Sequence, residues 1–389
     1  MFIITSSPGL GHSLKTKTAS DTRAPVWRID LRSVGFTGLA PKQETWGLHF
    51  RPNPLCFADQ QVLVATFITR ENVTALARRD QPDDPLPLRL HGTFLDASTG
   101  KVQASREWPI TRPRGGIVAT GGGGFAVLVP AGLASYSPSR ELLKDLKLSS
   151  EQQSHLWDIH SSPTGKSFLM EYHYPEASFQ WVDANSLQPQ PAWGESMPGV
   201  SISDSELTIT RDTYIKSKGY ISEVLVRSRD GPWRAICRVE PGMGEGCGIP
   251  QFVSNKVLAL WLPHELKVAS TDGEVLSAIS LAEDDWIGRP LYPSANGERF
   301  AMTVWAHKGG STLLDISYHR MLKRIVVYDI PSGHPIYTFE AKKRQSKDVS
   351  GVAVSPDGSL LAILTDGVLE VYQLPSSRDP SGSAVPTPK

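Results

Sequence analysis

Apolar and β-branched residues fall into short runs along the chain, and turn-forming residues separate these runs. The clearest stretch lies near the C-terminus, where Gly351–Val354, Leu360–Leu364 and Val368–Leu374 are predicted strands. The turns SPDG and TDG lie between them. Pro and Asp at the centre of a turn, followed by Gly, fit a type I turn, and the flanking runs are rich in β-prone residues. The stretch therefore predicts three antiparallel strands joined by two tight hairpins.

The first of these hairpins recurs upstream, each time followed by an apolar run. The recurrences are SANG at Ser294–Gly297, SPTG at Ser162–Gly165, and weaker versions at Val253–Lys256, Ser203–Glu206, Gly121–Gly124 and Phe57–Gln60. A second hairpin lies downstream of each: Asp96–Val102, Tyr136–Leu142, Asp183–Gln188, Ser228–Trp233, Thr271–Val275 and Asp329–Pro335. Six units of four strands therefore precede a seventh unit that stops after three strands.

An isolated β segment near the N-terminus, PVWRIDL at Pro25–Leu31, supplies the missing strand. Pairing it beside Val368–Leu374 completes the seventh unit and removes the open edges of the ring. The predicted fold is all-β, a seven-bladed β-propeller of four-stranded antiparallel blades closed by the N-terminal strand. Residues 25–375 form the single predicted domain, between flexible tails at 1–24 and 376–389. A pair of β-sandwiches is the alternative, but it would not predict the recurring paired hairpins or the complementary ends.

The hairpins carry a family resemblance. SPDG and SPTG, together with the second hairpins FLDASTGKV and VVYDIPSGHP, resemble those of WD-repeat-like and YVTN-type β-propellers, especially divergent bacterial ones. The resemblance covers about Val26 to Leu374, which is nearly the whole chain. It implies a propeller architecture and specifies no function, because one fold serves many functions.

Charge and hydropathy exclude some classes of partner. Forty basic residues balance forty acidic ones, so the chain lacks the electrostatic footprint of non-specific nucleic-acid binding. No apolar run approaches the length of a membrane span. The apolar patch at Phe2–Ile4 is too short for the core of a signal peptide, so the chain as written shows no export signal. The sequence is compatible with an exported protein, periplasmic or extracellular, and equally with a cytoplasmic one. We expect the protein to be a monomer.

The cysteines leave two interpretations of the compartment. Cys237 and Cys247 lie ten residues apart around a Gly/Pro-rich connection. A disulfide between them would imply an oxidising compartment, whereas two free thiols would fit a cytosolic protein. The chain has three cysteines and no CxxC, so cysteines alone cannot build a four-ligand zinc site.

Two long connections are the main candidates for a recognition surface. The stretches Arg70–Pro87 in unit one and His307–Lys323 in unit six separate the second and third strands of their units. Because both units neighbour unit seven, both insertions are expected on the same sector of one face. Long loops are commonly either functional or disordered. The candidate contacts are Arg78, Arg79, Asp83, Asp84, His307, Tyr318, His319 and Arg320; solvated, poorly ordered excursions are the alternative. The leading hypothesis is a non-enzymatic scaffold for a protein or peptide.

Catalytic and cofactor motifs are absent from the sequence. The glycines of Gly121–Gly124 precede a strand rather than a helix, which excludes a phosphate loop. Neither G-x-S-x-G nor H-E-x-x-H occurs, and no cofactor is predicted. An enzyme or small-ligand propeller with its site at the central channel mouth remains an alternative, and so does a structural domain of an exported bacterial protein. The candidate groups for a channel site are Asp158, Asp204, Glu245, Asp284, Asp285 and His160, the last of these also fitting a structural histidine.

Overall fold

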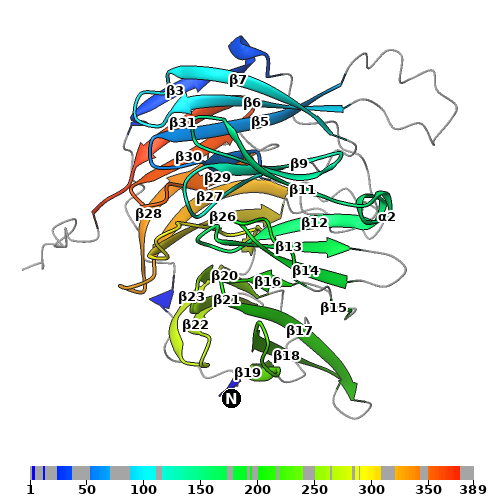
Figure 1. Ribbon diagram of the computed structural model, residues 1–389. Coiled ribbons are helices and arrows are strands. Elements are labelled where there is room, and N and C mark those ends of the chain that lie inside the picture. Colours follow the sequence, from blue (N-terminus) through cyan, green and yellow to red (C-terminus); the bar gives the residue numbers. More distant parts are fainter. Residues whose placement is uncertain are drawn as a thin grey trace, which may run out of the picture.

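Seven β-sheets form the molecule, as predicted (Figure 1). The computed structural model describes residues 2–4, 12–13, 24–36, 53–70, 88–110, 116–172, 178–190, 193–194, 200–215, 219–239, 250–262, 265–282, 285–288, 290–307, 320–341 and 349–376. Each sheet is a blade that begins with an inner strand and proceeds outward through antiparallel neighbours. Among the described residues, no helix is long and apolar enough to span a bilayer.

The strands of the first three blades follow one another along the chain. Blade 1 contains β4 (Leu55–Phe57), β5 (Val62–Arg70), β6 (Leu88–Asp96) and β7 (Val102–Ile110). Blade 2 contains β8 (Ile117–Ala119), β9 (Phe125–Val129), β10 (Gly132–Tyr136) and β11 (Leu142–Lys147). A short helix, α2 (Ser150–His155), leads to blade 3, which contains β12 (Leu156–Ser161), β13 (Ser167–Tyr172), β14 (Ser178–Asp183) and β15 (Trp193–Gly194).

The next three blades repeat this order. Blade 4 contains β16 (Ser201–Ile202), β17 (Glu206–Ile215), β18 (Gly219–Ser228) and β19 (Arg234–Val239). Blade 5 contains β20 (Gln251–Ser254), β21 (Val257–Leu262), β22 (Glu265–Ser270) and β23 (Val275–Ser280). In blade 6 the inner strand is divided into β24 (Asp285–Ile287) and β25 (Tyr292–Pro293), and β26 (Arg299–His307), β27 (Arg320–Asp329) and β28 (His334–Glu340) follow.

Blade 7 joins the two ends of the propeller. It contains β29 (Val349–Val354), β30 (Leu360–Thr365) and β31 (Val368–Gln373), and its outer strand is β3 (Trp27–Asp30). β3 runs antiparallel to β31, with Trp27 opposite Val371 and Asp30 opposite Val368. Figure 1 shows blue β3 next to red β31. The predicted closure by the N-terminal strand is therefore confirmed. The short 3-10 helix η1 (Leu31–Val34) follows β3.

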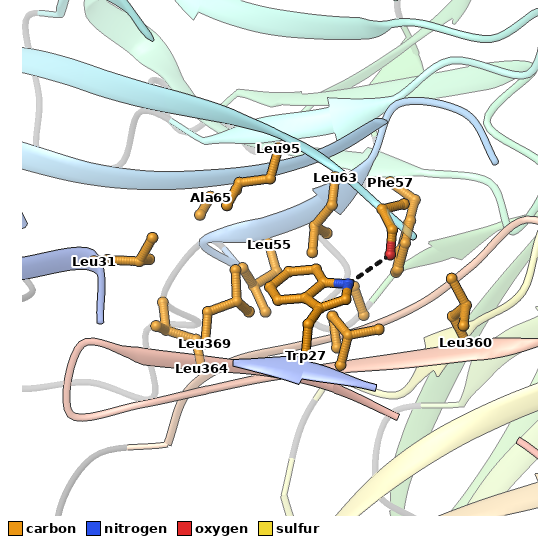
Figure 2. Close-up of a cluster of buried hydrophobic side chains, with 14 of the residues drawn as sticks. Trp27, Leu31, Leu55, Phe57, Leu63, Ala65, Leu95, Leu360, Leu364 and Leu369 are labelled. Atoms are coloured by element: carbon orange, nitrogen blue, oxygen red, sulfur yellow. Dashed lines mark hydrogen bonds between the residues drawn. The ribbon is translucent and has the colours of Figure 1, made fainter. Parts of the chain in front are cut away.

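The core is divided among the junctions between blades. Seven clusters of buried side chains are present in the described part of the chain, and each joins one pair of neighbouring blades. The cluster between blades 7 and 1 includes Trp27, whose indole N–H donates to the Ala97 carbonyl at 2.8 Å (Figure 2). Successive side chains of a strand point to opposite faces of its blade. The two faces of each blade therefore pack against different neighbouring blades.

Two short N-terminal strands add to outer edges of the ring. β1 (Phe2–Ile4) pairs in parallel with β19 of blade 4, and β2 (His12–Ser13) pairs in parallel with β23 of blade 5. Figure 1 accordingly shows the N-terminus beside β19. Both strands fall within 1–24, the segment for which we expected a flexible tail, while the C-terminal tail lies almost entirely outside the described residues. The domain boundaries stay a prediction.

Candidate functional site

The first and second hairpins lie on the same face of the molecule. Backbone hydrogen bonds connect the two hairpins within a blade, as from Ala97 N–H to the Gln61 carbonyl in blade 1 and from Thr271 N–H to the Lys256 carbonyl in blade 5. The connections between the second and third strands must therefore lie on the opposite face, because the strands are antiparallel.

The first hairpins contact one another around the ring, and we call them together the hairpin ring. It comprises residues 58–61, 120–124, 162–166, 203–206, 254–256, 294–298 and 355–359. Backbone bonds join Gly124 N–H to the Ala58 carbonyl (blades 2 and 1) and Gly121 N–H to the Gly165 carbonyl (blades 2 and 3). Asn296 N–H donates to the Pro356 carbonyl (blades 6 and 7). The ring thereby fixes neighbouring inner strands relative to one another.

Asp204, one of the predicted channel carboxylates, is a bridging group of the hairpin ring. It accepts hydrogen bonds from Thr164 Oγ1 at 2.6 Å and from Asn255 Nδ2 at 2.7 Å. Its carboxylate thus connects blades 3, 4 and 5. A carboxylate held by the two neighbouring blades is suited to a structural role. Its hydrogen bonds orient it towards the adjacent hairpins of the ring.

A central cavity of about 590 Å³ runs along the axis of the ring. It is lined by inner strands or adjoining residues of all seven blades, from β4, β8, β12, β16, β20, β25 and β29. Most of the lining is apolar, including Leu55, Ile117, Ile159 and Leu291. Its size is that of a site for a small organic molecule.

Several polar side chains in the cavity wall bind the neighbouring inner strand. Gln251 donates to the Leu291 carbonyl at 2.7 Å and accepts from the Leu291 N–H at 2.8 Å, which joins blades 5 and 6. Asn53 donates to the Val352 carbonyl at 2.7 Å, which joins blades 1 and 7. The phenol of Tyr292 also lines the cavity, and burial raises the pKa of Tyr292. The side chains of Gln251 and Asn53 thus brace the ring from inside.

The titratable pair in the cavity is His160 with Glu171. His160 Nε2 lies 2.8 Å from Glu171 Oε2, and the side chains are 26% and 18% exposed. His160 comes from β12, the inner strand of blade 3, and Glu171 comes from the adjacent β13. The sequence analysis singled out His160 but missed Glu171. The signal was available, because Glu171 is the lone charged residue in the otherwise apolar run SFLMEY.

Asp285, another predicted channel carboxylate, is bound elsewhere, within its own blade. Asp285 is fully buried and bonded to Lys323 Nζ at 2.5 Å and to an Arg324 guanidinium nitrogen at 2.6 Å, inside blade 6. The side chain of Asp158, and the residues Glu245 and Asp284, lie outside the described part of the chain. Where the chain is described, no group of three or more His, Cys, Asp or Glu side chains is placed to hold a metal ion.

The two predicted insertions begin from matching places. In blade 1, β5 and β6 remain paired up to Arg70 opposite Leu88, and in blade 6, β26 and β27 remain paired up to His307 opposite Arg320. Both blades pack against blade 7. Arg78, Arg79, Asp83, Asp84, Tyr318 and His319 lie outside the described residues, and of His307 and Arg320 only the backbone is described. These candidate contacts stay predictions.

The two cysteines among the described residues, Cys56 and Cys237, are buried in the core. Cys237 is buried between blades 4 and 5, and its thiol is free in the structure. Cys247 lies outside the described residues, so the choice between a Cys237–Cys247 disulfide and two free thiols stays at the level of the sequence analysis. Burial raises the pKa of the Cys56 thiol to about 12, so that thiol is protonated and a poor nucleophile at neutral pH.

The comparisons with known proteins show the fold. No protein-family model matches the chain, and no curated protein matches it. A chain in the crystal structure of the mitotic checkpoint complex is similar, with a TM-score of 0.53 and 10% identity over 91% of this chain and 96% of that one. The C-terminal WD40 domain of Sif2 gives a TM-score of 0.46 and 10% identity, covering 84% of this chain and 97% of the domain. The seven blades make this chain a seven-bladed β-propeller, and the first likeness extends over nearly the whole of this fold.

Proposed function

We propose that this protein is a non-enzymatic scaffold that holds a protein or peptide partner. The partner would bind on the insertion face, which we define as residues 71–87 and 308–319 together with the strand ends that carry them. The observation that supports this is the placement of the two longest connections within blades. They leave blades 1 and 6 on the same face, on either side of blade 7.

The composition of the insertions suits a polar protein surface. The first contains Arg78 and Arg79 close to Asp83 and Asp84, and the second contains Tyr318, His319 and Arg320. Arg and Tyr are enriched at protein interfaces, where each combines apolar contact area with directional hydrogen bonds. The similar chain of the mitotic checkpoint complex is itself part of a protein assembly. We further propose that the protein acts as a monomer and binds no nucleic acid.

The test compares two matched double charge reversals in the full chain. Arg78→Glu with Arg79→Glu alters the insertion face, whereas Lys144→Glu with Lys147→Glu alters exposed positions on β11 of blade 2. The partner is first identified by affinity capture from the native organism, and its affinity for each purified variant is then measured by calorimetry. We expect the first variant to bind at least about tenfold more weakly, as for loss of an interfacial Arg contact.

Removing Val73–Asp84 provides the stronger version of this test. We expect this deletion to leave the melting temperature close to that of the wild type and to abolish partner binding, because the removed residues belong to an inserted connection. If the deletion and the Arg78/Arg79 variant both bind the partner with unchanged affinity, the insertion face is not the binding site. An equal loss of affinity in the control variant on β11 would show that the partner does not bind specifically at the insertion face.

A further inference from the structure

The outer edges of blades 4 and 5 carry strands from the N-terminal end of the chain. Phe2–Ile4 (β1) pairs with Cys237–Val239 of β19, and His12–Ser13 (β2) pairs with Ile279 and Ser280 of β23. Both pairings are parallel, whereas the strands within blades 4 and 5 pair in antiparallel fashion. The N-terminal strands are therefore additions to finished blades, and two neighbouring edges accept them in the same direction.

These additions cover only part of each edge. β19 and β23 have six residues each, of which β1 pairs with three and β2 with two. In the part of the chain that the structure describes, no other strand pairs with either outer edge. An outer strand directs alternate backbone N–H and C=O groups away from its blade. Each edge thus offers further hydrogen bonds to an extended chain.

Apolar side chains accompany these backbone groups. Val275 and Leu276 lie at the end of β23 that β2 does not pair with, and they are 42% and 43% exposed. β1 itself is Phe-Ile-Ile, a sequence of high β propensity. Main-chain hydrogen bonds and contacts for apolar side chains are the two features by which a sheet edge binds an extended peptide. The occupant that suits these edges is therefore an extended apolar segment.

Few interactions hold the segment that occupies the edges. A parallel pairing of two or three residues makes few hydrogen bonds, and each contributes modestly in water. The covalent tether adds an effective concentration on the order of millimolar for a short linker. A free segment that makes comparable or more extensive contacts can therefore replace β1 and β2 when its concentration approaches this value.

We propose that the outer edges of blades 4 and 5 bind an extended apolar segment of another protein, which adds as a strand parallel to β19 or β23. β1 and β2 occupy this site in cis, and the incoming segment displaces them. The site lies on the outer strands of blades 4 and 5, whereas the insertion face lies beside blade 7. The two proposals use different residues, so each stands or fails alone.

A disulfide tests the occupant in cis. Ile3 pairs with Arg238, and neighbouring strands lie about 4.8 Å apart, within the usual Cα separation of a disulfide. In a background of Cys247→Ser, Ile3→Cys with Arg238→Cys should form an intramolecular disulfide under mild oxidation. Ile3→Cys with Lys144→Cys, on the outer strand of blade 2, should not. Equal yields by mass spectrometry, or a disulfide-linked dimer in place of the intramolecular bond, would overturn the cis assignment.

Capture of a free peptide tests the site in trans. The probe is a synthetic peptide of residues 1–13 with Ile3→Cys, and the full chain carries Ile3→Pro with Ile4→Pro to disable β1. Because N–H groups alternate between the two sides of a strand, two successive prolines remove one that faces β19. Arg238→Cys and Cys247→Ser complete the variant. The yield of the mixed disulfide in a thiol–disulfide buffer is measured by mass spectrometry.

Two comparisons locate the captured peptide. We expect at least about tenfold more capture than by the Arg238→Cys chain with an intact β1, whose tethered strand covers the edge. Capture should also exceed that by Lys144→Cys in the disabled chain. Equal capture in either comparison would overturn the proposal. An unmodified peptide of residues 1–13 should compete at millimolar concentration, and the same peptide with Ile3→Pro and Ile4→Pro should not; equal competition would show thiol reactivity without strand addition.

Matched surface variants test the contribution of blade 5. Val275→Lys with Leu276→Lys replaces the exposed apolar side chains of β23, and Leu142→Lys with Leu143→Lys changes similarly exposed side chains on β11 of blade 2. We expect the first pair to reduce capture at Arg238→Cys several-fold and the second pair to leave it unchanged. Circular dichroism confirms that both proteins are folded. Equal capture by the two proteins would exclude blade 5 from the site and contradict the proposal as stated.

Discussion

At the scale of single residues, aspartates hold the second hairpins in shape. Asp96 Oδ1 accepts hydrogen bonds from the hydroxyls of Ser98 at 2.6 Å and Thr99 at 2.9 Å, and from both backbone N–H groups. These bonds lower the pKa of Asp96. At Asp183 burial acts to raise the pKa, but hydrogen bonds from Ser186 and Asn185 outweigh it and the pKa is lowered. In each of these turns the hydrogen bonds thus favour the ionised form of the aspartate.

The lowered pKa of Asp96 predicts a pH dependence of stability. A carboxyl group whose pKa is lower in the folded state contributes stability above its unfolded pKa, which is about 3.9, and loses it as the pH falls through the folded value. We therefore expect Asp96→Asn to be less stable than the wild type at pH 7, and the difference to narrow in acid. Urea unfolding at a series of pH values measures this. The control Asp145→Asn changes an exposed residue on β11, and a similar pH-dependent gap there would contradict the assignment to the turn.

Trp27 carries much of the packing at the closing junction. It is buried, donates to the Ala97 carbonyl, and lies among leucines of blades 7 and 1 (Figure 2). Gly100 has a φ of +73°, and a Cβ there would lie 2.5 Å from the indole ring, so the turn accommodates this tryptophan only with glycine.

We expect Trp27→Ala to destabilise the protein by about 3–5 kcal/mol, the usual cost of emptying a buried aromatic site. Trp27→Phe keeps part of the packing and removes the hydrogen bond, so it should lie between the alanine variant and the wild type. Urea unfolding followed by circular dichroism gives both values. An alanine variant as stable as the wild type would show that this cluster does not limit the stability of the ring.

Some residue roles were predictable from the sequence and others were not. The positions of Asp96, Asp183 and Asp329 before a turn identified them as hairpin residues, because turn chemistry is local. The partnership of His160 with Glu171 depends on the register of β12 against β13, which a single sequence does not specify. The roles of Asp204 and Asp285 also depend on neighbours from other strands and blades.

At the scale of elements, the hairpins predicted the blades well. The apolar runs expected after the hairpins at Phe57–Gln60 and Gly121–Gly124 are β5 (Val62–Arg70) and β9 (Phe125–Val129). The length of a strand was less predictable: after the hairpin at Ser203–Glu206, β17 continues to Ile215 because it pairs along its whole length with β18. It also did not predict the parallel strands β1 and β2, since no hairpin turn connects them to their partners.

The closing strand predicts a difference between two truncations. Removal of residues 1–20 takes away β1 and β2, which add three and two residues to sheet edges. Removal of all residues before Ser33 also takes away β3 and Trp27 and opens the ring at β31. We expect the shorter truncation to lower the melting temperature slightly and the longer one to lower it strongly. Equal melting temperatures of the two truncated proteins would show that β3 is dispensable.

At the scale of the whole molecule, stability comes from a cycle of similar junctions. Each hydrophobic cluster joins two neighbouring blades, and the hairpin ring and the cavity braces add polar bonds between neighbours. In such an arrangement a blade depends mainly on the two beside it, as the repeats of a solenoid do, with the difference that a ring leaves no terminal repeat uncovered.

The pairing of β3 with β31 also has a consequence for synthesis. Translation produces β3 long before β31, because the other blades lie between them in the sequence, whereas the strands within each of the other blades leave the ribosome within a short interval of one another. During elongation, therefore, β3 offers an unpaired strand and the Trp27 side chain to any neighbour, including a second nascent chain. Exchange of β3 between two copies is the misassembly to which this order of synthesis exposes the protein, and chaperones that bind short apolar strands would suppress it.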